Sequence, residues 1–243
     1  AVSVRISDLV EYLQGFGVSD ALIPLLIMTS SFESGLNNDV IGTNSNVNGA
    51  NGVVTALFIN NGKLSWYHRT STASPILNLS QTYSAGAWYN FIVTWSASTG
   101  EIKGYINGKY INKTSGVNDI EWGNELEVGR YFGGLYSFDG KLSNFAMWNT
   151  TLTDGGVSFN EIAGGQVAEV YNLGQPQASI TGSPVGWWKL DDQNTITDYS
   201  GNNYTGTNNG AVDATGDVTT SGFNIPVNGV STTLPSTALQ QSD

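Results

Sequence analysis

Apolar and polar residues alternate over long stretches of this chain. In residues 88–96, Tyr89, Phe91, Val93 and Trp95 take every second position. Successive side chains of a strand point to opposite faces of its sheet, so this period of two predicts a strand with one buried face. A surface helix would need apolar positions spaced by three and four residues.

Turn residues separate the alternating stretches at short intervals. Asn107-Gly108 lies between two such stretches and is a strong hairpin signal, because Asn and Gly accept the positive φ angles of a tight turn. Asn60-Asn61-Gly62 predicts a second hairpin, and Thr99-Gly100 a third turn. The strands predicted on these grounds cover residues 53–59, 63–69, 88–96, 101–106, 109–113, 125–130 and 138–148. Their number and spacing predict an antiparallel all-β sandwich.

The first thirty residues have a different pattern. Asp8 and Glu11 have the spacing of a capping box, which predicts a short helix. A short apolar run follows, interrupted by Pro24, and predicts a buried strand over residues 25–32. We therefore separate an N-terminal arm, residues 1–24, from the sandwich that follows it.

The last part of the predicted sandwich contains the other helical candidate, residues 153–173. Val167, Val170 and Tyr171 recur at helical spacing, and Gly174 would end the helix. Four glycines make its first half a poor helix. We place the sandwich over residues 25–175 and a C-terminal extension over residues 176–243, whose last thirty residues are polar and predict a tail that is disordered or held by a neighbour.

Composition limits the kinds of function. The 243 residues carry a formal net charge of −11, which disfavours binding to a phosphate backbone. The chain has no cysteine, which excludes disulfides, thiol catalysis and cysteine-bound zinc. Its one histidine, His68, lies within a predicted strand and is interpreted as structural. No apolar stretch has the ~20 residues that a membrane-spanning helix needs.

Four segments occur in the order typical of one known family. They are FINNGKLSWY (58–67), AGAWYNFIVTWSASTGEIKGYINGK (85–109), LEVGR (126–130) and FDGKLSNFAMWNTTLT (138–153). Together with the Tyr-Asn-Leu-Gly sequence that ends at Gly174, they resemble the laminin-G-like, concanavalin A-like lectin superfamily over residues 25–175. The resemblance implies a jelly-roll β-sandwich with short helices, in which Trp88, Trp95 and Trp148 are core anchors on facing sheets.

The C-terminal extension contains a stretch, residues 188–206, that is similar to the opening of such domains. This layout resembles structural proteins of marine tailed phages. The resemblance implies a decoration, fibre or capsid-associated protein on a virion surface, with other virion proteins or further copies of itself as partners. Because paired tryptophans need burial, we expect the segment around Trp187 and Trp188 to pack against a neighbouring domain or subunit and so to serve assembly.

Calcium is the one cofactor that the sequence suggests. Laminin-G-like domains often hold this ion at the rim of the sandwich, where carboxylate, amide and carbonyl oxygens bind it. The candidate ligands are Asp191, Asp192, Asp198 and Asn202, with Asp119 and Asp139 as further possibilities. The alternative interpretation is that these side chains only stabilise turns.

Sugar binding and glycan hydrolysis point to different residues. The candidate ligand-binding aromatics are Trp66, Tyr131, Phe132 and Tyr136, with packing in the core or at an edge as the alternative. A glycanase needs two carboxylates that flank the scissile bond. The catalytic strand of the glycanases that share the resembled fold reads Glu-x-Asp-x-x-Glu, and the nearest run here offers Glu125 and Glu127 without the third carboxylate, so that a solvated strand face is the alternative interpretation.

We therefore expect a non-enzymatic virion structural, decoration or fibre protein with a lectin-like domain that binds cell-surface glycans. The alternatives are a secreted carbohydrate-binding module and then a glycanase. Either of the first two functions places the chain at a virion surface or outside the cell.

Overall fold

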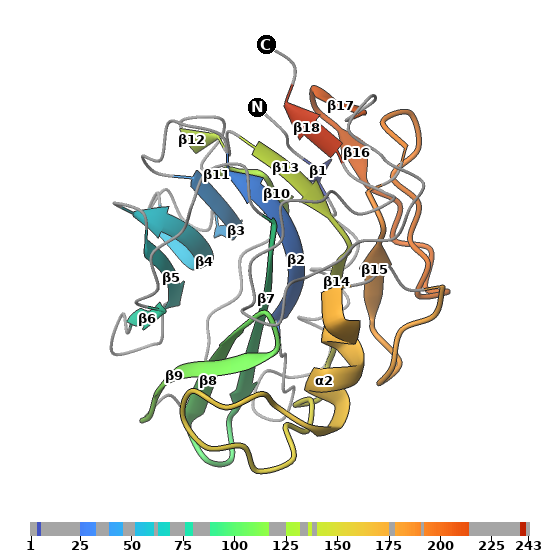
Figure 1. Ribbon diagram of the computed structural model, residues 1–243. Coiled ribbons are helices and arrows are strands. Elements are labelled where there is room, and N and C mark those ends of the chain that lie inside the picture. The colour runs from blue at the N-terminus through green and yellow to red at the C-terminus, as the bar shows by residue number, and fades with distance from the viewer. Residues whose placement is uncertain are drawn as a thin grey trace.

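The protein folds into two stacked antiparallel sheets with a short helix against one of them (Figure 1). The computed structural model describes residues 4–5, 25–32, 39–45, 52–60, 63–68, 76–79, 88–116, 125–131, 136–137, 140–174, 178–190, 192–213 and 239–241. The architecture is the predicted jelly-roll sandwich, because alternating apolar residues give each sheet one face to bury.

The first sheet is built around a run of consecutive hairpins. Its strand order is β16 (Thr207–Asn208), β1 (Val4–Arg5), β10 (Glu125–Val128), β3 (Asp39–Ser45), β4 (Gly52–Asn60), β5 (Lys63–His68) and β6 (Ile76–Leu79). The hairpin predicted around Gly62 is confirmed, with Asn60 paired to Lys63.

The second sheet contains the longest alternating segment. Its order is β17 (Ala211–Asp213), β18 (Leu239–Gln241), β13 (Gly140–Ser143), β2 (Leu25–Phe32), β7 (Trp88–Ser96), β8 (Glu101–Ile106) and β9 (Lys109–Thr114). A further strand, β14 (Phe145–Met147), pairs with both β2 and β15 (Gly186–Trp188). The turn at Asn107-Gly108 is confirmed, with φ angles of 50° and 71°.

Two predicted strands are broken in the structure. Gly129, with φ 80°, separates β10 from β11 (Arg130–Tyr131), which pairs with β12 (Tyr136–Ser137). Asn144, with φ 56°, separates β13 from β14. A positive φ turns the chain out of the extended conformation, so each predicted strand ends there and a new one begins.

One core lies between the two sheets. On β8, Gly104 faces the other sheet so closely that an added Cβ would lie 2.2 Å from a methyl carbon of Leu79. Ile102 stands two residues away on the same face and is paired with Trp95 of β7. Both of these side chains are buried, so the predicted anchor role of Trp95 between the sheets is confirmed.

A second core lies on the outer face of the same sheet. Helix α2 (Gly165–Tyr171) covers this face, followed by the 3₁₀ turn η3 (Asn172–Gly174). The members of this core are Ile92, Tyr105, Tyr110, Ala146, Trp148, Leu152, Ala163, Val167, Val170, Tyr171 and Trp187. Trp148 is therefore buried as predicted, but it packs with the residues of α2 rather than in the layer between the sheets. The side chain of Trp88 lies outside the described residues.

The helix predicted over residues 153–173 is wrong in its first half. Gly155 and Gly156 have φ angles of 72° and 73°, so this half is a loop, and α2 is limited to Gly165–Tyr171. No side chain at the N-cap, Gly164, caps the helix. Instead, Thr153 accepts the backbone N–H of Gln166 through its hydroxyl oxygen and that of Val167 through its carbonyl oxygen. The loop thus supplies the cap that the helix itself lacks.

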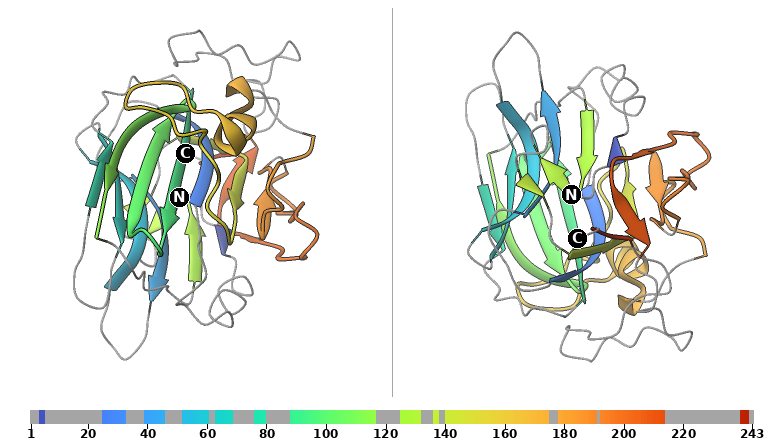
Figure 2. Two further views of the ribbon diagram at one scale, coloured as in Figure 1. Left: turned by 90° about the horizontal axis from the view of Figure 1, so that it is seen from below. Right: turned by 90° about the horizontal axis from the view of Figure 1, so that it is seen from above.

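The C-terminal segment packs on the sandwich of its own chain (Figure 2). Strand β15 pairs with β14, and Trp188 is fully buried with its ring 5.5 Å from that of Phe145. Trp187 is 5% exposed and belongs to the outer core. Of the two expected partners, the neighbouring domain of the same chain is therefore the one that buries these tryptophans, and a neighbouring subunit is not needed to cover them. The predicted extension also supplies strands to the same two sheets.

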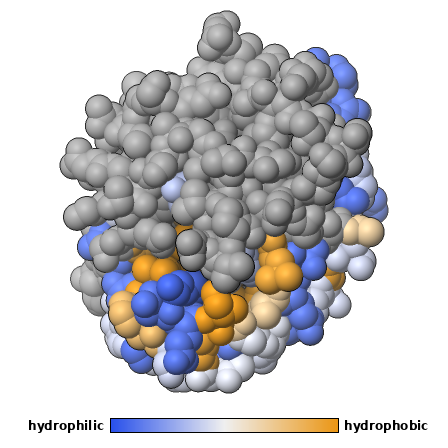
Figure 3. Space-filling view, viewed as in Figure 1, coloured by the Kyte–Doolittle hydropathy of each residue, from blue (hydrophilic) through white to orange (hydrophobic). Residues whose placement is uncertain are grey.

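Several expectations lie outside the described residues, namely the N-terminal helix and all but residues 239–241 of the predicted polar tail. In the part of the chain that is described, no helix is long and apolar enough to cross a membrane. On the described part of the surface in view, hydrophobic and hydrophilic residues are intermixed (Figure 3). Among all the described residues, the exposed large apolar side chains are Phe159, Ile162, Leu173 and Tyr199.

Candidate functional site

A cleft lies on the outer face of the second sheet, beside the core that α2 covers. It has a volume of about 490 Å³ and is formed by β7, β8 and the loop of residues 151–156. Its lining residues are Thr94, Ser96, Glu101, Lys103, Tyr105, Thr151, Leu152, Thr153, Asp154, Gly155 and Gly156. Ligand sites are usually concave and carry a few convergent polar groups, so this cleft is the candidate site.

Strand alternation places the polar side chains of the cleft. Thr94 is paired with Lys103, and Ser96 with Glu101, across β7 and β8. The residues between them, such as Trp95, point to the core between the sheets. Towards α2 the same outer face becomes apolar, beginning at the pair of Ile92 and Tyr105. The cleft thus begins where the apolar cover of the outer face ends.

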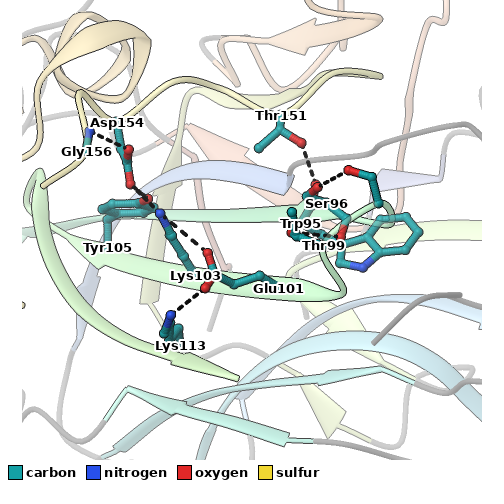
Figure 4. Close-up of polar contacts among 11 residues, drawn as sticks. Trp95, Ser96, Thr99, Glu101, Lys103, Tyr105, Lys113, Thr151, Asp154 and Gly156 are labelled. Carbon is teal, nitrogen blue, oxygen red and sulfur yellow. Dashed lines mark hydrogen bonds and ion pairs between the residues drawn. The ribbon is translucent and has the colours of Figure 1, made fainter. Parts of the chain in front are cut away.

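Charged side chains form a connected network at the cleft (Figure 4). The Lys103 ammonium donates to Asp154 Oδ2 at 2.9 Å and lies 3.5 Å from Glu101 Oε2. The Tyr105 hydroxyl donates to the same Asp154 oxygen at 2.7 Å, and Lys113 donates to Glu101 Oε1 at 2.5 Å. Both carboxylates of the cleft are therefore held by one shared ammonium.

The network keeps its members charged. Burial raises the pKa of Asp154, but hydrogen bonds from Lys103, Tyr105 and the Gly156 amide outweigh burial, so the pKa lies below its ordinary value of 3.8. The hydrogen bond from Lys113 and the nearby ammonium of Lys103 lower the pKa of Glu101, even though burial opposes them. Burial lowers the pKa of Lys103, but its contacts with Asp154 and Glu101 leave that pKa raised overall. At neutral pH the cleft holds two carboxylates and one ammonium.

The loop that closes the cleft is fixed at both ends. Near its start, the Thr151 hydroxyl donates to the backbone oxygen of Trp95 at 2.7 Å. Asp154 accepts the Gly156 amide at 3.0 Å in an Asx turn, and its backbone oxygen accepts the Gly164 amide. Glycine suits position 156, where φ is 73°. The cleft wall is therefore held by the sheet on one side and by the start of α2 on the other.

Glu101, Lys103, Tyr105 and Asp154 were not among the predicted site residues. The sequence did contain a signal for the first three, because alternate positions of one predicted strand share a face. No pattern along the chain linked that strand to Asp154, which lies 51 residues after Lys103.

The predicted aromatic sugar site is not assembled from the described residues. Trp66 is 2% exposed, so its ring is part of the interior and cannot present a face to a ligand. This corrects its predicted binding role. Tyr131 and Tyr136 are paired across β11 and β12, and their side chains, like all of Phe132, lie outside what the structure describes.

Two of the candidate calcium ligands have hydrogen-bond partners within the chain. Asp198 Oδ1 accepts the amides of Trp187 and Ser200, and its Oδ2 accepts the Ser200 hydroxyl and the Tyr204 amide. These four bonds use all the lone pairs that a carboxylate offers. Asn202 directs its amide nitrogen, a donor, to the backbone oxygen of Val185.

The remaining candidates are less fully engaged or lie outside the described residues. Asp192 accepts the backbone amide of Asn194 in an Asx turn, so it has the turn-stabilising role that was given as the alternative to calcium binding. Asp191, Asp119 and Asp139 lie outside the described residues. Within the described ranges, no three His, Cys, Asp or Glu side chains form a group that could hold a metal ion. Calcium binding by this chain stays a prediction.

The glycanase candidates Glu125 and Glu127 lie on β10, which pairs with β3 and β1. Leu126 lies between the two glutamates and Val128 follows them. Both are buried, as expected for a strand whose side chains alternate between its two faces. The side chains of the two glutamates lie outside the described residues. The cleft on the second sheet is formed by other strands.

Comparisons with known proteins find similar solved structures and a matching family model. Among solved structures, a proposed carbohydrate-binding protein from Bacteroides ovatus matches with a TM-score of 0.56 and 17% identity, covering 86% of this chain and 55% of its own. The heptameric SAP-like pentraxin of Limulus polyphemus matches with a TM-score of 0.43 and 16% identity, over 63% and 71% of the two chains. The sialidase CBM40 of Ruminococcus gnavus, bound to α2,3-sialyllactose, has a TM-score of 0.42 and 16% identity, over 56% and 80%.

The likeness to the Bacteroides protein is one of fold, and this chain spans about half the length of that protein. A comparison with curated proteins finds no match. The family model described as concanavalin A-like lectin/glucanases superfamily matches residues 31–158, which is more than half of the chain. The chain therefore belongs to the concanavalin A-like lectin/glucanases superfamily.

Proposed function

We propose that this chain is a non-catalytic, lectin-like domain that binds a glycan in the cleft between β7, β8 and residues 151–156. The observation that carries the proposal is a concave site lined by hydroxyl and charged groups in a superfamily that includes lectins. The carbohydrate-binding role proposed for the similarly folded Bacteroides protein supports it.

The chemistry of the lining suits a sugar. Thr94, Ser96, Thr151 and Thr153 supply hydroxyl oxygens, each of which keeps room to accept a hydrogen bond beside the bonds that Thr151 and Thr153 make within the chain. Sugar hydroxyls can donate to these oxygens. The ionic network and the doubly anchored loop hold these groups in place before a ligand arrives, which reduces the entropy lost on binding.

The same network supports binding rather than hydrolysis at this cleft. A glycanase needs one carboxyl group with a raised pKa, so that it can protonate the leaving oxygen. The pKa values of Glu101 and Asp154 are both lowered, and each carboxylate already contacts Lys103. Neither group is then available as a general acid at neutral pH.

The test is a glycan array followed by calorimetry with any ligand that binds. Ser96→Arg places a long side chain in the cleft, and Ser158→Arg adds the same charge at an exposed position outside the cleft lining. We expect Ser96→Arg to abolish binding and Ser158→Arg to leave it within twofold of the wild type. Equal binding by both variants, each with the circular dichroism spectrum of the wild type, would show that the cleft is not the glycan site.

A reducing-end assay on the glycans that bind separates binding from hydrolysis. We expect no release of reducing ends over hours. Release that is lost in Glu101→Gln would assign a glycanase to this cleft, and release lost in Glu125→Gln would assign one to β10.

We also propose, from the sequence resemblance, that the chain acts on a virion surface as a decoration or fibre protein. That extracellular setting would bring a glycan-binding cleft to a host cell surface. Mass spectrometry of purified particles tests this setting independently of the cleft. A secreted carbohydrate-binding module is the alternative, and the chain would then occur free in the culture medium and not in particles.

A further inference from the structure

Counting donors and acceptors at the cleft shows which kind of sugar it suits, if the proposed glycan binding holds. An ammonium group has three N–H donors. Lys103 directs one to Asp154 and one to Glu101, so a single N–H is left for a ligand. Lys113 is bound to Glu101 and is not among the residues that line the cleft. Lys103 is therefore the one ammonium that the described cleft can offer.

The acceptors of the cleft are less completely used. A carboxylate has about four lone-pair sites. Glu101 uses one oxygen for Lys103 and the other for Lys113, which leaves about half of its sites. Asp154 has three partners, which are Lys103, Tyr105 and the Gly156 amide. More free acceptors than charged donors therefore remain, chiefly on Glu101, whose side chain is 24% exposed.

The net charge of the lining leads to the same conclusion. The two carboxylates and one ammonium of the lining leave an excess of one negative charge, which the exposed ammonium of Lys113, 2.5 Å from Glu101 but outside the lining, offsets in part. The formal net charge of the whole chain is −11. A sugar carboxylate brings acceptors only, and its charge has the same sign as that excess. One extra like charge at ~4 Å costs roughly a factor of five in affinity even in water, and more in a cleft.

We infer that the cleft takes neutral sugars and that Glu101 is the residue that excludes acidic ones. In this arrangement neighbouring hydroxyls of the sugar donate to the free lone pairs of Glu101, and the remaining N–H of Lys103 binds a sugar oxygen. The serine and threonine hydroxyls around them complete the contacts. This selectivity for neutral sugars rests on the proposed glycan binding, and it can be disproved while that binding still holds.

The experiment compares matched ligands on one array. Each neutral oligosaccharide is printed beside the counterpart in which a hydroxymethyl group is replaced by a carboxylate, and beside the counterpart in which a hydroxyl is replaced by an amine. We expect neutral ligands to bind at least fivefold more tightly than their acidic counterparts. Acidic or amino ligands that bind as well as neutral ones, or better, would overturn the inference while leaving the proposed function intact. No binding to any sugar would overturn the proposed function itself.

Two further measurements assign the selectivity to Glu101. Glu101→Gln removes the charge and keeps the shape, so the preference for neutral over acidic ligands should narrow to about twofold. Glu161→Gln makes the same change of net charge on an exposed loop residue and should leave the preference unchanged. In the wild type, raising the salt concentration should also narrow the preference, because salt screens the repulsion. A preference that neither Glu101→Gln nor salt alters would show that charge does not set it.

Discussion

The salt-bridged carboxylate of Asp154 joins the loop of the cleft to β8, and its removal should weaken the whole domain. Asp154→Ala deletes the acceptor for the Lys103 ammonium, for the Tyr105 hydroxyl and for the Gly156 amide. Tyr105 is almost fully buried, so its hydroxyl would lose a partner without gaining full access to water.

The size of the effect follows from these contacts. A buried hydroxyl left without its partner costs about 1–3 kcal/mol. The ion pair adds less than a fully buried pair would, because the side chain of Lys103 is 27% exposed and keeps its contact with Glu101. We expect Asp154→Ala to lower the free energy of unfolding by about 2–4 kcal/mol. Asp154→Asn keeps an oxygen for the Gly156 amide and should cost less.

The assay is urea unfolding followed by tryptophan fluorescence, with the free energy extrapolated to zero urea. The control is Glu161→Gln, which should change stability by less than about 0.5 kcal/mol because its side chain is exposed. If Asp154→Ala were as stable as this control, the network would not hold the loop, and our interpretation of the cleft as preformed would be wrong.

The pH dependence provides a second test of the same contact. The pKa of Asp154 is lower in the folded protein than its ordinary value of 3.8. The carboxylate therefore stabilises the fold at pH values above 3.8, and this stabilisation is lost as the pH falls through the lowered pKa. The difference in stability between the wild type and Asp154→Asn should be full at pH 6 and shrink below pH 3.8. A difference that stays constant from pH 6 to pH 2.5 would contradict the assignment.

Three further predictions concern the elements that support the site. Trp188→Ala should lower the free energy of unfolding by about 3–5 kcal/mol, because the ring is fully buried against Phe145; a loss below 1 kcal/mol in urea unfolding would mean that the C-terminal segment does not pack on β14. Thr153→Ala should cost about 1 kcal/mol and Thr153→Ser much less, since the hydroxyl caps α2; equal losses would exclude the cap. Asp198→Asn should lower the melting temperature equally with calcium and with a chelator; a calcium-dependent rise in the wild type that the variant lacks would restore the calcium site.

Local signals in the sequence predicted much of the architecture correctly. The bounds of β2 and the two hairpins were predicted because a period of two and an Asn-Gly turn are encoded by neighbouring residues. The first half of the predicted helix was wrong, and the strands predicted over residues 125–130 and 138–148 are each broken in two. Gly155, Gly129 and Asn144 mark the places where the chain turns. These residues permit a positive φ but do not require it, so their effect depended on the surrounding fold.

The amino-acid sequence by itself determined the fold class, the family and the strand face that carries residues 101, 103 and 105, because each of these depends on the order and spacing of side chains. Only the tertiary structure decided that Asp154 meets that face, that Trp188 is covered by its own chain and that Asp198 accepts three backbone amides and the Ser200 hydroxyl. Such pairings join residues far apart along the chain, and their energies depend on burial and on distances that no local pattern contains.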